Sequence, residues 1–216
     1  MTITIREPGS AITHFIAMVL AALAAAPLLV KAAFDAGRVG VFSMAVFMTS
    51  MILLYGASTL YHSVNLNGHS LRIFRKIDHM MIFVLIAGSY TPVCLLVLEP
   101  QSGHTLLITV WAIAAVGMLV KAFWITCPKW FSSIIYIAMG WACLSVFGEL
   151  LTALSRPAFL WLLTGGLLYT AGGVIYALKL PVFNSIHKNF GSHEIFHLFV
   201  MGGSICHFIC MYQYIV

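Results

Sequence analysis

Long apolar runs separated by short polar links repeat along the whole chain. A helix needs roughly 20 mostly apolar residues to cross the hydrocarbon core of a bilayer. Seven runs of about that length occur, at residues 12–34, 39–62, 77–98, 105–126, 131–152, 157–179 and 193–215. The pattern therefore predicts an all-α fold, in which residues 1–216 form a single domain, a bundle of seven transmembrane helices.

The composition leads to the same prediction. Hydrophobic residues make up 62% of the chain and charged residues 8%, whereas a soluble domain carries about 25% charged residues. A soluble fold of 216 residues could not bury so much apolar surface, so lipid must surround most of the chain. The net charge of +5 is scattered without a basic run, which argues against a nucleic-acid partner.

The lysines and arginines predict the orientation of the bundle. The N-terminal segment and the second, fourth and sixth links carry Arg6, Arg72, Arg75, Lys76, Lys121, Lys129, Lys179 and Lys188, against Lys31, Arg38 and Arg156 on the other side. Because positive links stay in the cytoplasm, we expect a cytoplasmic N-terminus and an external C-terminus. The chain is expected to be a multi-pass protein of the inner (plasma) membrane, with membrane lipids as its partners.

Polar residues gather at three of the predicted helix ends. Ser58 and His62 end the second helix, Asp78 begins the third, and His193 and His197 begin the seventh. Alternating topology places all five at a similar depth, in the inner leaflet. Ionisable residues are costly within a membrane, so each of them is a candidate for function.

The spacing of the histidines suits a metal ion. His193 and His197 lie four residues apart, on one helix face, which lets two imidazoles bind one metal. His62 would add a third nitrogen, and three protein ligands with one open position are the catalytic zinc pattern. Zinc lowers the pKa of its water to about 7. Asp78 could accept a hydrogen bond from that water or from a ligand histidine, and Ser58 could donate one to a developing oxyanion.

Packing is an equally open interpretation of these residues taken alone. Two histidines on an apolar helix often pack or bond to a neighbouring helix, and Asp78 could pair with Arg75 or Lys76. Three imidazoles also suit transition ions other than zinc. His14 could line a cavity, but we expect it to pack at the membrane interface. His207 lies about 15 Å deeper than His197, and we expect it to make a buried hydrogen bond.

Several segments together resemble the hemolysin III family, the bacterial branch of the progestin and adiponectin receptor superfamily, which is related to the alkaline ceramidases. They are residues 57–62 (ASTLYH), 76–79 (KIDH), 86–92 (IAGSYTP), 139–141 (MGW), 193–197 (HEIFH) and 202–208 (GGSICHF). The resemblance covers residue 12 to the C-terminus. It implies seven transmembrane helices with a cytoplasmic N-terminus and a zinc ion held by His62, His193 and His197. It also implies that Ser58 and Asp78 lie near the metal.

The resemblance implies a zinc-dependent hydrolase that acts on a lipid amide or ester arriving from the inner leaflet. Asp78 would then accept a proton and Ser58 would steady the oxyanion. One alternative is a non-enzymatic membrane protein, a sensor or a factor in membrane homeostasis, with a structural zinc. Another is the cytolytic or channel activity that the hemolysin name suggests. A channel needs a continuous polar path, and the outer halves of the predicted helices offer few polar groups.

Overall fold

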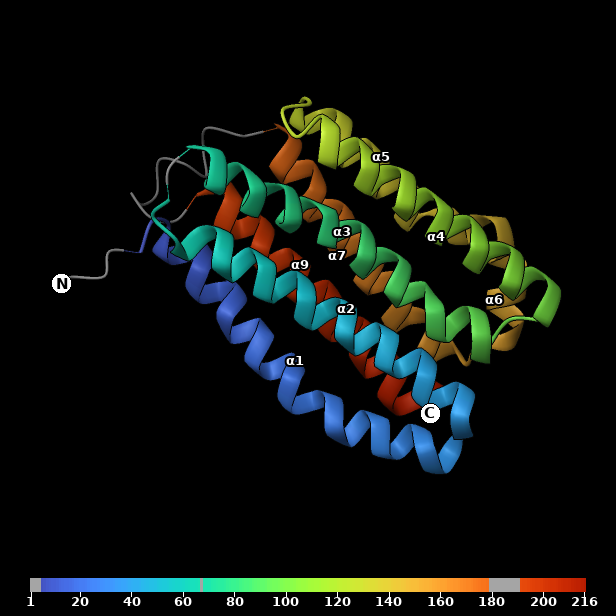
Figure 1. Cartoon of the computed structure of the whole chain (residues 1–216). Helices are drawn as coiled ribbons and strands as arrows, with labels where there is room; N and C mark the ends of the chain where they lie inside the picture. The colour runs from blue at the N-terminus through green and yellow to red at the C-terminus, as the bar shows by residue number, and fades with distance from the viewer. Residues whose placement is uncertain (1–4, 67, 179–190) are drawn as a thin grey trace.

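The structure of the chain is a computed structural model that describes residues 5–66, 68–178 and 191–216. Every regular element in these residues is helical, and seven helices are long and apolar enough to cross a membrane. They run side by side as one bundle (Figure 1). The predicted all-α, seven-helix membrane architecture is therefore confirmed.

Five of the spans are single helices, the fifth is interrupted, and the seventh ends in a π-helical turn. In chain order the elements are α1 (Pro8–Asp35), α2 (Gly37–Ser63), α3 (Gly68–Leu96), α4 (Pro100–Phe123), α5 (Lys129–Gly140), a 3-10 segment (Ala142–Val146), α6 (Phe147–Ala153), α7 (Arg156–Leu178), α9 (Ser192–Cys210) and a closing π-helical turn (Met211–Ile215). Helix α3 starts well before the apolar run at residue 77, because backbone hydrogen bonds continue a helix through a polar stretch. Pro27 and Pro92 lie inside α1 and α3, and both helices continue through them.

The link between α1 and α2 is very short. Only Ala36 separates the two helices, and Gly37 follows it with a φ of 60°. That angle lies in the left-handed region, which glycine adopts without the steric cost that a Cβ would bring. The chain therefore reverses within about one residue, and α1 and α2 form an antiparallel pair.

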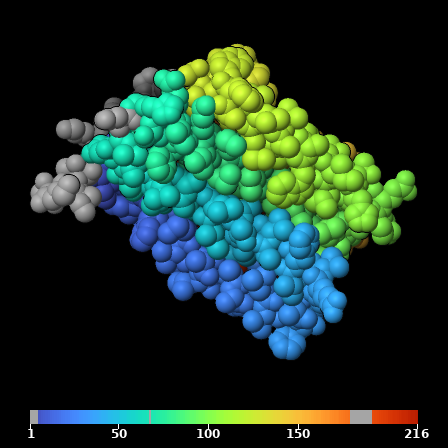
Figure 2. Space-filling model, viewed as in Figure 1, coloured from blue at the N-terminus to red at the C-terminus, as the bar shows by residue number. Residues whose placement is uncertain are grey.

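Helix α2 lies at the centre of the bundle, whereas α5 lies at its periphery. Half of the most apolar window of α2 is buried within the protein, against 11% for the fifth span, Lys129–Ala153. A Cβ added to Gly88 of α3 would lie 2.6 Å from the Cβ of Ser50 in α2. The absence of a side chain at residue 88 thus lets the two central helices approach closely. Figure 2 shows the outer face to which α1 to α5 contribute.

Antiparallel packing brings seven helix termini to one end of the bundle. The starts of α1, α3, α5 and α9 and the ends of α2, α4 and α7 lie together (Figure 1). We call this the N-terminal end of the bundle. It holds the polar residues that the sequence singles out.

Candidate metal centre

Three histidines from two helices meet at the N-terminal end. His62 of α2 and both His193 and His197 of α9 each offer one ring nitrogen, and these three nitrogens lie within 4.8 Å of one another. The Nε2 atoms of His62 and His193 are 3.2 Å apart. Nitrogens bound at about 2.1 Å to a tetrahedral zinc lie roughly 3.4 Å apart. The spacing therefore fits a shared metal ion, and we call these residues the histidine cluster.

Hydrogen bonds to the outward nitrogens hold two of the three rings. Nδ1 of His62 lies against the carboxylate of Glu7, and Nδ1 of His197 lies 3.3 Å from Oγ1 of Thr13. Thr13 already donates its proton to backbone carbonyls, so it accepts from His197. A metal-binding histidine usually donates its second N–H in this way, which fixes its tautomer and orientation. Both rings thus keep the Nε2 lone pair for a metal.

Glu7 is a hydrogen-bond partner of the histidine cluster that the sequence analysis did not identify. It directly precedes α1, and its backbone N–H donates to the carbonyl of His62 at 3.0 Å. The hydrogen bond from His62 holds the pKa of the Glu7 carboxyl at about 2, although partial burial acts in the opposite direction. The carboxylate therefore stays ionised at neutral pH. Nothing in the hydropathy pattern signals this residue, because its role depends on how deeply α1 sits beside α2.

Glu194 occupies the glutamate position of an HExxH sequence, and both of its carboxylate oxygens accept hydrogen bonds from residues outside the histidine cluster. Its carboxylate accepts a hydrogen bond from the Gly191 backbone N–H at 2.8 Å and another from the Ser10 hydroxyl at 2.5 Å. The first hydrogen bond gives a partner to a backbone N–H at the start of α9, and the second connects α9 to α1. These contacts are typical of a structural residue, whereas the glutamate of soluble HExxH enzymes is a general base.

Asp78 and Ser58 lie beside the histidine cluster. Both side chains are buried, with 7% and 1% exposure, and both line the same cavity as His193 and His197. Oδ2 of Asp78 lies 3.1 Å from Nδ1 of the neighbouring His79. The structure therefore brings all five residues of the sequence-based site to one place.

His14 belongs to this region too, so the expectation that it packs at the membrane interface is wrong. Its ring is 3% exposed, lines the cavity and stacks on His197, with centroids 3.6 Å apart and planes 7° apart. Neither of its ring nitrogens has a hydrogen-bond partner among the described residues. His207, by contrast, makes the expected buried hydrogen bond, to the carbonyl of Leu162 at 3.3 Å.

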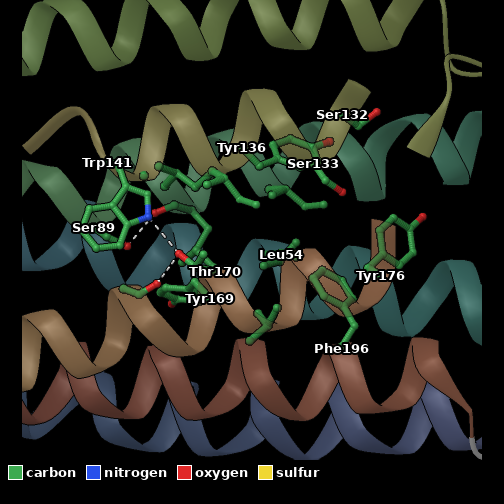
Figure 3. Close-up of a pocket in the computed structure, with 18 of the residues that line it drawn as sticks. Leu54, Ser89, Ser132, Ser133, Tyr136, Trp141, Tyr169, Thr170, Tyr176 and Phe196 are labelled. Carbon is green, nitrogen blue, oxygen red and sulfur yellow. Dashed lines mark hydrogen bonds between the residues drawn. The ribbon is translucent and has the colours of Figure 1, made fainter. Parts of the chain in front are cut away.

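The cavity extends from the histidine cluster into the apolar interior between α3, α5, α7 and α9. Figure 3 shows Ser132, Ser133 and Tyr176 towards one end of it, and Ser89, Trp141 and Thr170 towards the other. The indole N–H of Trp141 donates to Oγ1 of Thr170 at 2.9 Å. A long, mostly apolar space with a polar end is suited to an acyl chain.

Comparison with known proteins identifies the family. Residues 3–208 match the family described as "Haemolysin-III related". The "Hemolysin-3 homolog" of Bacillus subtilis is 37% identical over 214 residues, which are 99% of this chain and 96% of that protein. "Hemolysin-3" of Bacillus cereus is 35% identical over 97% of this chain and 92% of its own length. The human "Monocyte to macrophage differentiation factor" is 28% identical over 79% of this chain and 69% of its own length. The chain is therefore a multi-pass membrane protein that belongs to the hemolysin III family.

Proposed function

We propose that this protein is a zinc-dependent membrane hydrolase that cleaves an amide or ester bond of a lipid. The observation that carries the proposal is the position of the histidine cluster. Three ring nitrogens within 4.8 Å of one another lie beside a mostly apolar cavity that Asp78 and Ser58 also line. A ligand set for a metal, a buried carboxylate, a hydroxyl donor and space for a lipid are thus combined at one site.

Each residue then has a role in the reaction. His62, His193 and His197 would hold the zinc, which would supply a Lewis acid for activating water and polarising a carbonyl. Asp78 takes the proton of the attacking water and later passes it to the leaving group. Ser58 donates a hydrogen bond to the carbonyl oxygen as negative charge builds on it. Glu7 and Thr13 keep the rings of His62 and His197 in the orientation that binding requires.

The stacking of His14 on His197 supports a ligand set without His14. Imidazole lone pairs lie in the ring plane, so two rings stacked 3.6 Å apart and 7° from parallel direct their lone pairs along separate planes. The three residues of the histidine cluster would then hold the zinc without His14.

A structural zinc in a non-enzymatic membrane protein is the second candidate function. The observation that favours it is the same His14, whose two ring nitrogens are buried without a partner in the part of the chain that is described. A rotation of this ring would supply a fourth nitrogen and close the site. Zinc would then tie α1, α2 and α9 together.

The proposal places the N-terminal end of the bundle on the cytoplasmic side of the inner membrane. The excess of Lys and Arg in the segments at this end supports that orientation. The lipid substrate would then enter from the inner leaflet.

Metal analysis tests the proposal. We expect close to one zinc per chain in detergent-purified protein by plasma mass spectrometry, and its loss in His193→Ala/His197→Ala. His207→Ala, in the same helix but outside the cluster, is the matched control and should keep the metal. Asp78→Asn should keep zinc and lose hydrolysis of lipid amides and esters. An Asp78→Asn protein without zinc would make Asp78 a ligand and favour the structural role.

A further inference from the structure

Lys121, in the last turn of α4, carries a buried charge. The residue is 3% exposed, and its ammonium donates hydrogen bonds to Oγ of Ser132 at 2.5 Å and to Sγ of Cys127 at 3.1 Å. Neither acceptor is a carboxylate. Among the described residues no carboxylate oxygen lies within 4 Å of this ammonium. A charge inside a membrane protein is costly unless it is paired. An anionic ligand beside Lys121 would therefore be stabilising.

Two further cations line the same cavity. Arg75 of α3 and Lys129 of α5 are both part of its wall, together with Lys121. Nζ of Lys129 lies 4.2 Å from the ring centroid of Tyr176. Asp78 is the one carboxylate among the described lining residues, and it already lies against His79. Lys129 has interactions of its own, so Lys121 and Arg75 define what we call the cationic end of the cavity.

The rest of the cavity is mostly apolar. From the cationic end its wall continues past Ile82 and Ile137 to Phe147, Leu150 and Phe159 near the opposite end of the bundle. The polar side chains of Ser132 and Ser133 lie near one end of the view in Figure 3, and the ring of Tyr136 lies between them and Trp141. Such a cavity matches an amphiphile with an anionic head and an acyl tail.

We propose that the cavity binds an acyl lipid whose head group carries a phosphate, with the phosphate at the cationic end and the acyl chain along the apolar wall. Phosphate has several oxygens that accept hydrogen bonds from different directions. The ammonium of Lys121, the planar fork of Arg75 and the hydroxyls of Ser132 and Ser133 provide such a divergent set of donors. A carboxylate, with two oxygens, would leave part of this set unused.

This inference rests on the proposed function in one respect, because the bound phospholipid would be the substrate of the proposed hydrolase. His193 and His197 line the same cavity as the cationic end, and the ester of a glycerophospholipid is only a few bonds from its phosphate. Water adds to the acyl carbon, the bond from that carbon to the glycerol oxygen breaks, and Asp78 returns a proton to this oxygen. The products are a fatty acid and a phospholipid with one acyl chain fewer.

Binding of a lipid that cannot be hydrolysed tests the inference without requiring turnover. The probe is an ether-linked lysophosphatidylglycerol, and the competitor is a monoalkylglycerol ether of the same chain length, which lacks the phosphate; both are added to wild-type protein for native mass spectrometry. We expect at least about tenfold tighter binding of the anionic lipid, a difference of about 1.4 kcal/mol. Equal binding of the two lipids, or tighter binding of palmitate than of the anionic lipid, would overturn the inference. Displacement of the lipid by millimolar inorganic phosphate would also overturn it, because the site would then serve the free ion.

Variants connect the preference to the cationic end. Lys121→Met and Arg75→Gln should each abolish most of the tenfold preference, and Lys121→Arg should keep it. Arg72→Gln is the matched control, because Arg72 lies one turn earlier in α3, is exposed and does not line the cavity. Melting temperatures of all variants identify any that are misfolded. A well-folded Lys121→Met protein with unchanged preference would overturn the assignment.

The inference and the proposed function can fail separately. Selective binding of the anionic lipid by a protein without zinc would leave the inference intact and refute the hydrolase. If zinc-loaded wild type and Lys121→Met hydrolyse neutral ceramides at the same rate, the hydrolase proposal stands and the anionic-lipid inference is refuted.

Discussion

The carboxylate of Glu7 lies against Nδ1 of His62, the nitrogen that points away from the histidine cluster. A short segment before the first helix thus supports a residue at the end of the second. Glu7 touches no candidate ligand atom, so its effect on a metal must pass through the orientation and basicity of the imidazole.

Replacing Glu7 by Gln should weaken zinc binding without destroying the site. Loss of such an outer carboxylate typically costs about 10- to 100-fold in metal affinity. Competition with a chromophoric chelator measures this difference. Asp35→Asn, an exposed acid at the opposite end of α1, is the control and should bind zinc as wild type does. Wild-type affinity in Glu7→Gln would show that the contact does not support the metal.

Replacing Glu194 by Ala should cost stability and leave catalysis nearly intact. The variant loses the hydrogen bonds to Ser10 and to the backbone of Gly191, for a destabilisation of about 1–2 kcal/mol. Its rate of lipid hydrolysis per bound zinc should stay within about threefold of wild type, whereas loss of a general base costs roughly 10² to 10⁴. A drop of that size would mean that Glu194 acts as it does in soluble HExxH enzymes.

Replacing His14 by Phe separates the two candidate functions. Phenylalanine can stack on His197 but offers no nitrogen, so we expect a zinc content close to that of wild type. Plasma mass spectrometry again gives the measurement. Loss of zinc in a variant that keeps its wild-type melting temperature would identify His14 as a fourth ligand and the site as a closed, structural one.

Replacing Gly88 by Ala should destabilise the contact between α2 and α3. The new Cβ would lie 2.6 Å from the Cβ of Ser50, and overpacking of this kind costs about 1–3 kcal/mol. Gly166→Ala, where a Cβ would meet nothing within 4 Å, is the control for detergent melting curves. Adding Ser50→Gly should recover part of the loss, and failure to do so would place the strain elsewhere.

Hydropathy and helix alternation were sufficient to predict the seven spans and to place His62, Asp78 and His193 at one end of the bundle. Both rules depend only on chain order, so they need no knowledge of which helices touch. The contacts of Glu7 and His14 could not be predicted in this way. They depend on the depth and rotation of α1 against α2 and α9, which packing between side chains decides. The role of Glu194 was hidden for a different reason, because a carboxylate at the start of a helix can face either the backbone or a neighbouring site.

The tight reversal at Gly37 joins α1 and α2 into a hairpin of two helices of nearly equal length. The helices contain 28 and 27 residues, so each is about 40 Å long at 1.5 Å per residue, against roughly 30 Å for the hydrocarbon core. Tilt of the helices or projection into the head-group layer accommodates the excess, and Glu7, the residue that precedes α1 and touches His62, has a side chain that is 45% exposed. A hydrolase within a bilayer must obtain water from somewhere. The length of this hairpin sets how far the site lies from the interfacial water that would supply it.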